Sequence, residues 1–355
     1  MDLNPTLFGT ALARTLLASA QAPLSEALER LGRATLARPT YRQRWAGLDP
    51  GCAGLLMAKK LLRQPDLATL SPKAARRTLR EQTALIDGPA PEVATVEASV
   101  ALPGPGGVAV PVRIYRSRGL RPGGPALIWL HGGGFVVGDF ETHDAACRRL
   151  CANLALTVIA ADYRLAPEFP FPAAWDDALT VFDWVRREAR SLGVAPERIA
   201  MGGDSAGGAL TASVANARRG QMALQVLLYP GTDFTRSMPS HETRRQDFLL
   251  DKPLLDWFVN HTFRPNELRH PRASVYFEPE LSEVAPAIVV TAGFDPLRDE
   301  GDAYAGRLRA AGVPVEHWCE SALLHGTHTM TGALRSAARA TTRLHDAVAR
   351  KLAAL

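Results

Sequence analysis

A serine flanked by glycines is the first residue of this sequence that could act as a nucleophile. It stands in Gly203-Asp204-Ser205-Ala206-Gly207, directly after the β-like run Arg198–Met201 and before the helix-compatible stretch Ala206–Gly220. A sharp strand-to-helix turn needs such glycines, because a β-carbon there would collide with neighbouring atoms. The Ser205 hydroxyl would then lie above the end of a sheet, beside the free N–H groups of a helix N-terminus. Any sequence rich in Gly and Ala can contain this pentapeptide by chance, so the prediction needs further residues.

Three consecutive glycines upstream could supply hydrogen-bond donors for acyl transfer. They stand in His131-Gly132-Gly133-Gly134-Phe135, which follows the apolar strand-like run Ala126–Leu130. Their N–H groups could point into a cavity in which a carbonyl oxygen gains negative charge during the reaction. A flexible glycine turn would explain the triplet alone, but the two motifs occur in the order of a lipase or esterase oxyanion hole. We expect His131 to brace this loop by a hydrogen bond.

A serine nucleophile needs a base and an acidic group that orients the base. Downstream, the apolar strand-like run Ala287–Ala292 leads into Gly293-Phe294-Asp295-Pro296. Asp295 is the first carboxylate after this strand, which makes it the candidate acid. The carboxylates that follow it are expected to cap and fill the first turn of the next helix, where negative charge is favourable; they are Asp299, Glu300 and Asp302.

Two histidines compete for the role of base. His325 and His328 both follow the strand-like run Val313–Cys319, in the loop His325-Gly326-Thr327-His328. His325 comes first and precedes a glycine, which lets the loop place its ring, so the sequence favours His325. His328 could instead lie at the N-terminus of a helix, or contact the base without taking part in the reaction. His317 lies inside the strand and is expected to be structural.

Several long motifs, in order, make the chain resemble the hormone-sensitive-lipase-like branch of the α/β-hydrolases, known in bacteria as family IV esterases. The resemblance covers roughly residues 95–350. The matching stretches are His131-Gly132-Gly133-Gly134-Phe135, Gly138-Asp139-Phe140-Glu141-Thr142-His143-Asp144, Asp162-Tyr163-Arg164-Leu165-Ala166-Pro167-Glu168-Phe169-Pro170-Phe171-Pro172-Ala173-Ala174, Gly203-Asp204-Ser205-Ala206-Gly207-Gly208, Asp295-Pro296-Leu297-Arg298-Asp299-Glu300-Gly301 and His325-Gly326.

The resemblance implies a serine carboxylesterase that hydrolyses short- to medium-chain acyl esters through an acyl-enzyme intermediate and needs no cofactor or metal. It implies Ser205 as nucleophile, Asp295 as orienting acid and His325 as general base. The implied oxyanion donors are the backbone N–H groups of Gly133, Gly134 and Ala206. Family members usually carry a bulky residue after the His-Gly pair, whereas this chain has Thr327, which raises the question of the pocket's shape beside the base.

Two other functions compete with the esterase. One is a deacetylase or amidase that uses the same triad on a different bond. The other is a non-catalytic homologue that binds a small ligand in the pocket. All three triad positions hold competent residues, which argues against the binding protein. A fluorophosphonate probe would label a serine hydrolase but not the non-catalytic binding protein, and so would separate these two classes.

Composition and charge exclude several other functions. The chain has 355 residues, 46% hydrophobic and 22% charged, with a formal net charge of +5. Its basic residues are mostly arginines spread along the chain and not clustered on one face, so no nucleic-acid binding is expected. No apolar run is long enough for a membrane span, and no stable membrane insertion is expected. The apolar stretch Leu7–Ala22 contains Arg14 and follows Asp2, so we expect an amphipathic helix there and not a signal peptide.

The four cysteines lack the paired spacing of a metal site and are too few for a disulfide scaffold. Reduced thiols and a cytoplasmic location are the simplest interpretation. The expected partner is a small-molecule ester, and a homodimer is compatible with the sequence although no feature of it establishes one.

Periodicity predicts an α/β fold with three helices before the main domain. These are expected at Ser25–Leu36, Cys52–Leu62 and Pro72–Ile86. Beyond Gly88–Pro91, a hairpin (Val96–Ala101 and Val108–Tyr115) precedes alternating strands and helices, which predicts a mostly parallel eight-stranded sheet with helices on both faces. We therefore expect an N-terminal helical cap in residues 1–90 and an α/β-hydrolase catalytic domain in residues 91–355. A cap-like insertion is expected at about residues 230–276.

Overall fold

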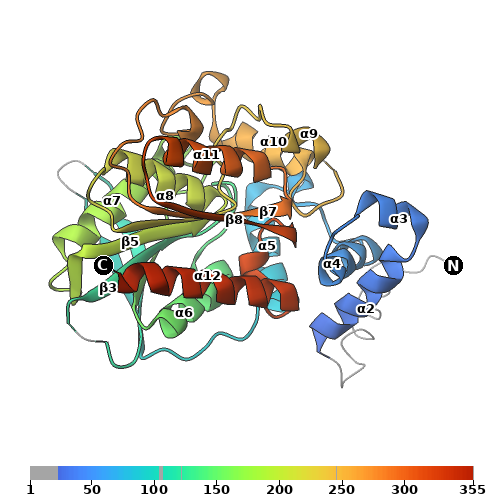
Figure 1. The fold of residues 1–355 in the computed structure, drawn as a ribbon, viewed down its shortest axis with the longest axis horizontal. Coiled ribbons are helices and arrows are strands. Elements are labelled where there is room, and N and C mark those ends of the chain that lie inside the picture. The colour runs from blue at the N-terminus through green and yellow to red at the C-terminus, as the bar shows by residue number, and fades with distance from the viewer. Residues whose placement is uncertain (1–22, 104–106, 121, 245, 355) are drawn as a thin grey trace.

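The protein is described by a computed structural model that covers residues 23–354, apart from 104–106, 121 and 245. The stretch Leu7–Ala22 and most of the expected turn at residues 104–107 therefore lie outside the described residues. The described chain forms a central sheet with helices on both faces (Figure 1). The predicted α/β-hydrolase architecture is confirmed.

The sheet has eight strands in the order β1-β2-β4-β3-β5-β6-β7-β8. β1 and β2 form the expected antiparallel hairpin, β2 also pairs antiparallel with β4, and every later pairing is parallel. All residues of β4 and β6 are buried, as is typical of parallel strands covered on both faces. The strands are β1 Thr95–Ala101, β2 Val110–Arg116, β3 Gly124–Leu130, β4 Thr157–Ala161, β5 Val194–Asp204, β6 Leu224–Leu228, β7 Ala287–Phe294 and β8 Val315–Leu324.

Two layers of helices bury the sheet. On one face, apolar residues of α6 and α12 pack against the strands, and on the other face α7, α8 and α11 do so. Figure 1 shows these two layers above and below the strands. The helices are α6 Phe140–Leu154, α7 Ala173–Arg187, α8 Ala206–Ala217, α11 Arg298–Ala310 and α12 Arg335–Ala353.

Helix α6 begins with a reciprocal cap that the sequence encodes. The Asp139 carboxylate accepts the backbone N–H of Thr142 at 2.9 Å, and the Thr142 hydroxyl accepts the N–H of Asp139 at the same distance. This pairing satisfies two N–H groups that would otherwise lack partners at the helix start. It also fixes the position of His143, the next residue, near the candidate site.

Among the described residues, four α-helices precede the sheet: the three predicted from periodicity and the additional short helix α3. Their bounds are α2 Leu24–Leu36, α3 Pro39–Arg44, α4 Pro50–Leu61 and α5 Pro72–Ile86. In Figure 1, α2, α3 and α4 group at one end of the sheet. Their apolar residues pack with the ends of β7 and β8 through Phe294, Leu323 and Leu324. Short helices follow β6, namely α9 Ser240–Thr243 and α10 Lys252–Thr262. The division into cap, catalytic domain and insertion stays a prediction.

Candidate active site

Ser205 lies at the turn between β5 and α8. Its φ of 55° and ψ of −116° belong to a region that residues with side chains rarely adopt, which is a form of backbone strain found at functional sites. A β-carbon at Gly207 would overlap the carbonyl oxygen of Leu130, so the close approach of helix and strand requires glycine there. The Ser205 N–H donates to the carbonyl of Leu228 at 2.8 Å. The strand–turn–helix arrangement predicted around Ser205 is therefore confirmed.

Two hydrogen bonds connect the serine, a histidine and an aspartate. Nε2 of His325 lies 2.9 Å from Oγ of Ser205, and its Nδ1 lies 2.7 Å from Oδ2 of Asp295. The other carboxylate oxygen of Asp295 accepts the N–H of Leu297 at 2.8 Å, and the side chain is completely buried. With the Nδ1 proton facing Asp295, Nε2 is left as the acceptor toward Ser205. This geometry is that of a nucleophile, a base and an orienting acid.

The sheet brings these residues together from distant parts of the sequence. Asp295 follows β7 and His325 follows β8, and these strands are parallel neighbours, so their carboxyl ends meet at one edge. The register between them shifts between Ala292 and Phe294. A bulge of this kind re-aims the side chains that follow it. Two residues of β7 face four residues of β8 across this shift, so the extra length lies in β8, directly before His325.

His328 occupies a different environment and does not contact Ser205. It belongs to a single 3₁₀ turn, Thr327–Thr329, and its ring packs against Trp129 with centroids 5.2 Å apart. Its N–H donates to the hydroxyl of Tyr229 at 3.3 Å. Burial lowers the pKa of His328 to about 3, so the ring stays neutral. Of the two histidines, the structure brings only His325 to the serine.

The glycine loop after β3 places unpaired N–H groups beside Ser205. Gly133 and Gly134 have φ values of 124° and 58°, which favour glycine. Their N–H groups, and that of Ala206 at the start of α8, donate to no other described residue. As expected, His131 braces this loop, because its Nδ1 lies 2.8 Å from the carbonyl of Gly132. The site thus holds several donors that a substrate oxygen could use.

A buried carboxylate next to Ser205 connects the serine turn to the glycine loop. Asp204 accepts the N–H of Gly132 at 3.1 Å and lies 3.2 Å from Nε2 of His143. Burial alone would raise the pKa of Asp204, but the charge and hydrogen bond of His143, together with smaller contributions from His328 and His131, lower the pKa to about 2. Asp204 therefore stays ionised and holds the loop to the serine turn at neutral pH.

A mostly apolar cavity of about 390 Å³ opens onto the serine, the histidine and the glycine loop. Its size falls within the range of small-molecule sites. Its walls come from the helices before the sheet and from the segment after β6, including Leu28, Leu79, Leu254, Phe258 and Phe263. Both the helices before the sheet and the segment at residues 230–276 thus contribute side chains to the cavity that contains Ser205.

Two features of the site could not be derived from the motifs. Thr327 is buried but does not line the cavity, which Gly326 and Met330 line instead. Its side chain therefore packs in the protein interior and does not form the cavity wall. Phe258 packs so closely over the glycine loop that a β-carbon at Gly134 would overlap its ring. No sequence signal identified this contact.

The expectation for the carboxylates after Asp295 was partly wrong. They lie in the first turns of α11, but the side chain of none of them caps the helix. Asp299 and Glu300 accept N–H groups of the segment after β6, and Asp302 contacts Thr291 and His317. Their partners lie far away in the sequence, which is why helix-end rules alone did not reveal them.

The comparisons with known proteins agree with this geometry. A family model described as an alpha/beta hydrolase fold matches residues 127–329, which is more than half of the chain. The chain belongs to the hormone-sensitive-lipase-like branch of the α/β-hydrolases. The model's match runs from β3 to the 3₁₀ turn after His325 and so contains every candidate site residue.

Several relatives are ester hydrolases by name. The chain is 43% identical over 251 residues to carboxylic ester hydrolase LipN of Mycobacterium tuberculosis, covering 67% of this chain and 66% of LipN. It is 40% identical to an ethyl acetate hydrolase of Pseudomonas putida, covering 68% and 78%. A solved ester hydrolase from the metagenome of Lake Arreo, bound to a bipyridine phosphonate derivative, superimposes with a TM-score of 0.82 at 36% identity, covering 85% and 98%.

None of the helices in residues 23–354 combines the length and the apolar character that crossing a bilayer requires. Within the same part of the chain, no group of three or more His, Cys, Asp or Glu side chains is arranged to hold a metal ion.

Proposed function

We propose that this protein is a serine carboxylesterase in which Ser205 is the nucleophile, His325 the general base and Asp295 the orienting acid. One observation carries the proposal. The hydrogen-bonded chain Asp295–His325–Ser205 ends at an apolar cavity, beside backbone N–H groups that have no other partner. Nucleophile, base and oxyanion donors are the three parts that acyl transfer requires.

The reaction follows from the positions of these groups. Oγ of Ser205 attacks the ester carbonyl while its proton passes to Nε2 of His325, 2.9 Å away. The oxyanion that forms accepts hydrogen bonds from the N–H groups of Gly133, Gly134 and Ala206. When the intermediate collapses, the alcohol leaves with the proton from His325 and the acyl group stays on Ser205. Water, deprotonated by His325, then attacks the acyl-enzyme, and the acid is released.

Asp295 supports the charge that His325 acquires. Its buried carboxylate lies 2.7 Å from Nδ1 and holds the ring in the tautomer that can accept the serine proton. We propose short- to medium-chain esters as substrates, because the cavity is modest in size and largely apolar. The name of the related ethyl acetate hydrolase, which refers to a short ester, supports the same range.

Hydrolysis of p-nitrophenyl esters from acetyl to palmitoyl tests this proposal. We expect turnover that peaks at short or medium chains and falls by several orders of magnitude in Ser205→Ala. Ser213→Ala is the matched control, because Ser213 is a buried serine of the same helix α8 outside the site. Activity that survived in Ser205→Ala would contradict the proposed nucleophile. A folded wild type inactive on every ester but active on amides or acetylated sugars would favour the amidase or deacetylase.

We also propose that the protein acts in the cytoplasm. All four cysteines are free thiols in the structure, and three of them are buried, which fits a reducing compartment. A homodimer stays a proposal that light scattering in solution would test.

A further inference from the structure

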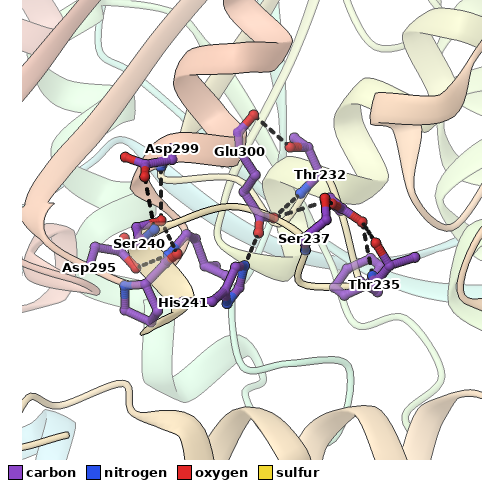
Figure 2. Close-up of polar contacts among 12 residues, drawn as sticks. Thr232, Thr235, Ser237, Ser240, His241, Asp295, Asp299 and Glu300 are labelled. Atoms are coloured by element: carbon purple, nitrogen blue, oxygen red, sulfur yellow. Dashed lines mark hydrogen bonds and ion pairs between the residues drawn. The ribbon is translucent and has the colours of Figure 1, made fainter. Parts of the chain in front are cut away.

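A buried glutamate close to the acid of the triad connects α11 with the segment after β6. Glu300 is completely buried, and its Oε1 accepts the N–H groups of Thr232 at 2.5 Å and Asp233 at 3.0 Å. Its Oε2 lies 2.6 Å from Nε2 of His241, which is buried as well. The backbone carbonyl of Glu300 also accepts the hydroxyl of Thr232 (Figure 2). One residue therefore holds both ends of the stretch from Thr232 to α9.

The preceding residue, Asp299, makes a parallel connection to α9. Its Oδ2 accepts the N–H of Ser240 at 2.8 Å, and its own N–H donates to the Ser240 hydroxyl at 3.2 Å. That hydroxyl donates in turn to the carbonyl of Pro296 at 2.6 Å. Figure 2 shows Asp299 and Ser240 close to Asp295. The contacts thus reach Pro296, the residue that directly follows the triad acid.

On the acid side, these contacts lead to Asp295 through the start of α11. The N–H of Gly301 donates to the carbonyl of Leu297 at 3.2 Å, and the N–H of Leu297 donates to Oδ1 of Asp295 at 2.8 Å. The N–H of Arg298 donates to the carbonyl of Asp295 at 3.2 Å. Any shift of Glu300 and the first turn of α11 would therefore move the Asp295 carboxylate.

On the nucleophile side, the same contacts lead to Ser205. Thr232, which Glu300 holds, follows Gly231, and the N–H of Gly231 donates to the carbonyl of Ser205 at 3.4 Å. Glu300 thus links the turn that carries the nucleophile to the loop that carries the acid. The two segments come from the ends of β5 and β7, which β6 separates in the sheet.

Burying a carboxylate is costly unless its oxygens are satisfied. Burial raises the pKa of Glu300, whereas His241 and the two backbone N–H groups act in the opposite direction. Because apolar replacements of buried ionic groups are often neutral or even stabilising, stability alone is a weak reason for a glutamate here. The fixed geometry of the hydrogen bonds that Glu300 makes is a better reason for a glutamate at this position.

We infer that Glu300, held by His241, is a positioning residue that fixes the Asp295 loop relative to the Ser205 turn. The inference rests on the proposed esterase function, because turnover is its most sensitive readout. Glu300 lies outside contact with the reacting atoms and acts only through Asp295 and the segment after β6. Displacement of a catalytic group by about 1 Å can lower the rate about 100-fold, so the loss of this link should be measurable.

The experiment compares Glu300→Ala with Glu300→Gln in kcat and KM for the best p-nitrophenyl ester. Glu300→Ala removes the acceptor for Thr232 and Asp233, and we expect kcat to fall about 100-fold with KM little changed. Glu300→Gln keeps a carbonyl oxygen for these two N–H groups, so it should retain kcat within about tenfold of the wild type. Rescue by glutamine is the signature of hydrogen-bond positioning.

Two further variants separate positioning from general destabilisation. Asp177→Ala removes another buried carboxylate, one that holds the N–H and guanidinium of Arg164 far from the triad in the sequence. It should lower the melting temperature but leave kcat within about threefold. His241→Ala removes the partner of Oε2 that holds Glu300, and it keeps the inference testable if Glu300→Ala fails to fold. A kcat loss in Asp177→Ala equal to that in Glu300→Ala, or an unchanged kcat in both Glu300→Ala and His241→Ala, would overturn the inference.

A structural readout does not depend on esterase activity. In a crystal structure of Glu300→Ala, or of His241→Ala if the former does not fold, the separation between Asp295 Oδ2 and His325 Nδ1 should exceed hydrogen-bond range, about 3.5 Å. An unchanged triad in that variant would refute the positioning role. A wild type that neither hydrolyses esters nor reacts with a fluorophosphonate would instead refute the proposed function, and the crystal structure would then decide the present inference.

Discussion

Replacing the triad acid by its amide tests the role of Asp295 in this particular hydrogen-bond arrangement. In the structure, one oxygen accepts the N–H of Leu297 and the other faces Nδ1 of His325. Asparagine has only one acceptor oxygen for these two places. If that oxygen stays on Leu297, the NH₂ group faces His325 and selects the tautomer with its proton on Nε2. That tautomer cannot accept the proton of Ser205.

The size of the effect follows from the same contacts. Turning the amide around restores the productive tautomer but leaves the buried N–H of Leu297 unpaired, which costs about 1–3 kcal/mol. The lost negative charge beside the protonated imidazole adds about 4 kcal/mol at an effective dielectric constant near 20. Together these losses of about 5–7 kcal/mol correspond to a rate reduction of roughly 10⁴-fold or more. We therefore expect kcat/KM of Asp295→Asn to fall by about 10⁴.

The assay is the steady-state hydrolysis of the best p-nitrophenyl ester, with thermal unfolding to confirm the fold. Asp302→Asn is the matched control, because Asp302 also accepts from a histidine, His317 at 2.9 Å, and lies on the helix that follows Asp295. The control should keep kcat/KM within about threefold of the wild type. If Asp295→Asn retained more than about a tenth of the wild-type value, the orienting role of Asp295 would be refuted.

Two other predictions concern stability and specificity. Burial lowers the pKa of three histidines, His131 to about 4, His328 to about 3 and His345 to about 4. Below pH ~6.5 the unfolded chain therefore binds protons on these histidines, whereas the folded chain does not. The free energy of unfolding in urea should therefore fall by roughly 2 kcal/mol per histidine between pH 6.5 and 5, and a pH-independent value would contradict this. Because Phe258 lines the cavity and covers Gly134, Phe258→Ala should shift the p-nitrophenyl series toward longer acyl chains; an unchanged profile would show that this ring does not limit chain length.

Much of the site was predictable because each motif answers a local physical need. Glycines around Ser205 have a specific use at a sharp turn, where the structure places a positive φ and a close helix–strand approach. Asp295 and His325 could be located because each is the first suitable residue after an apolar strand, and parallel strands end at the same edge of a sheet. The same argument favoured His325 over His328, and the structure brings His325 to Ser205.

The long-range contacts could not be predicted in this way. A glutamate in the first turn of a helix ordinarily interacts favourably with the helix dipole. This common explanation was sufficient for Glu300, so nothing in the sequence was a reason to expect another role. Its partners Thr232 and His241 lie 68 and 59 residues away in the sequence, and no periodicity reports such a pairing. The packing of Phe258 over Gly134 is likewise a tertiary contact between distant segments. Local rules therefore identified the three residues that the structure brings together, but not the contacts around them.

The most direct test of the central claim is the covalent labelling of the native protein by diethyl p-nitrophenyl phosphate, read by intact mass and peptide mapping. The account predicts one diethylphosphoryl adduct per chain on Ser205, loss of esterase activity in parallel with labelling, and no adduct in Ser205→Ala. A folded native protein that remained unlabelled, or an adduct on another residue with Ser205 unmodified, would contradict it.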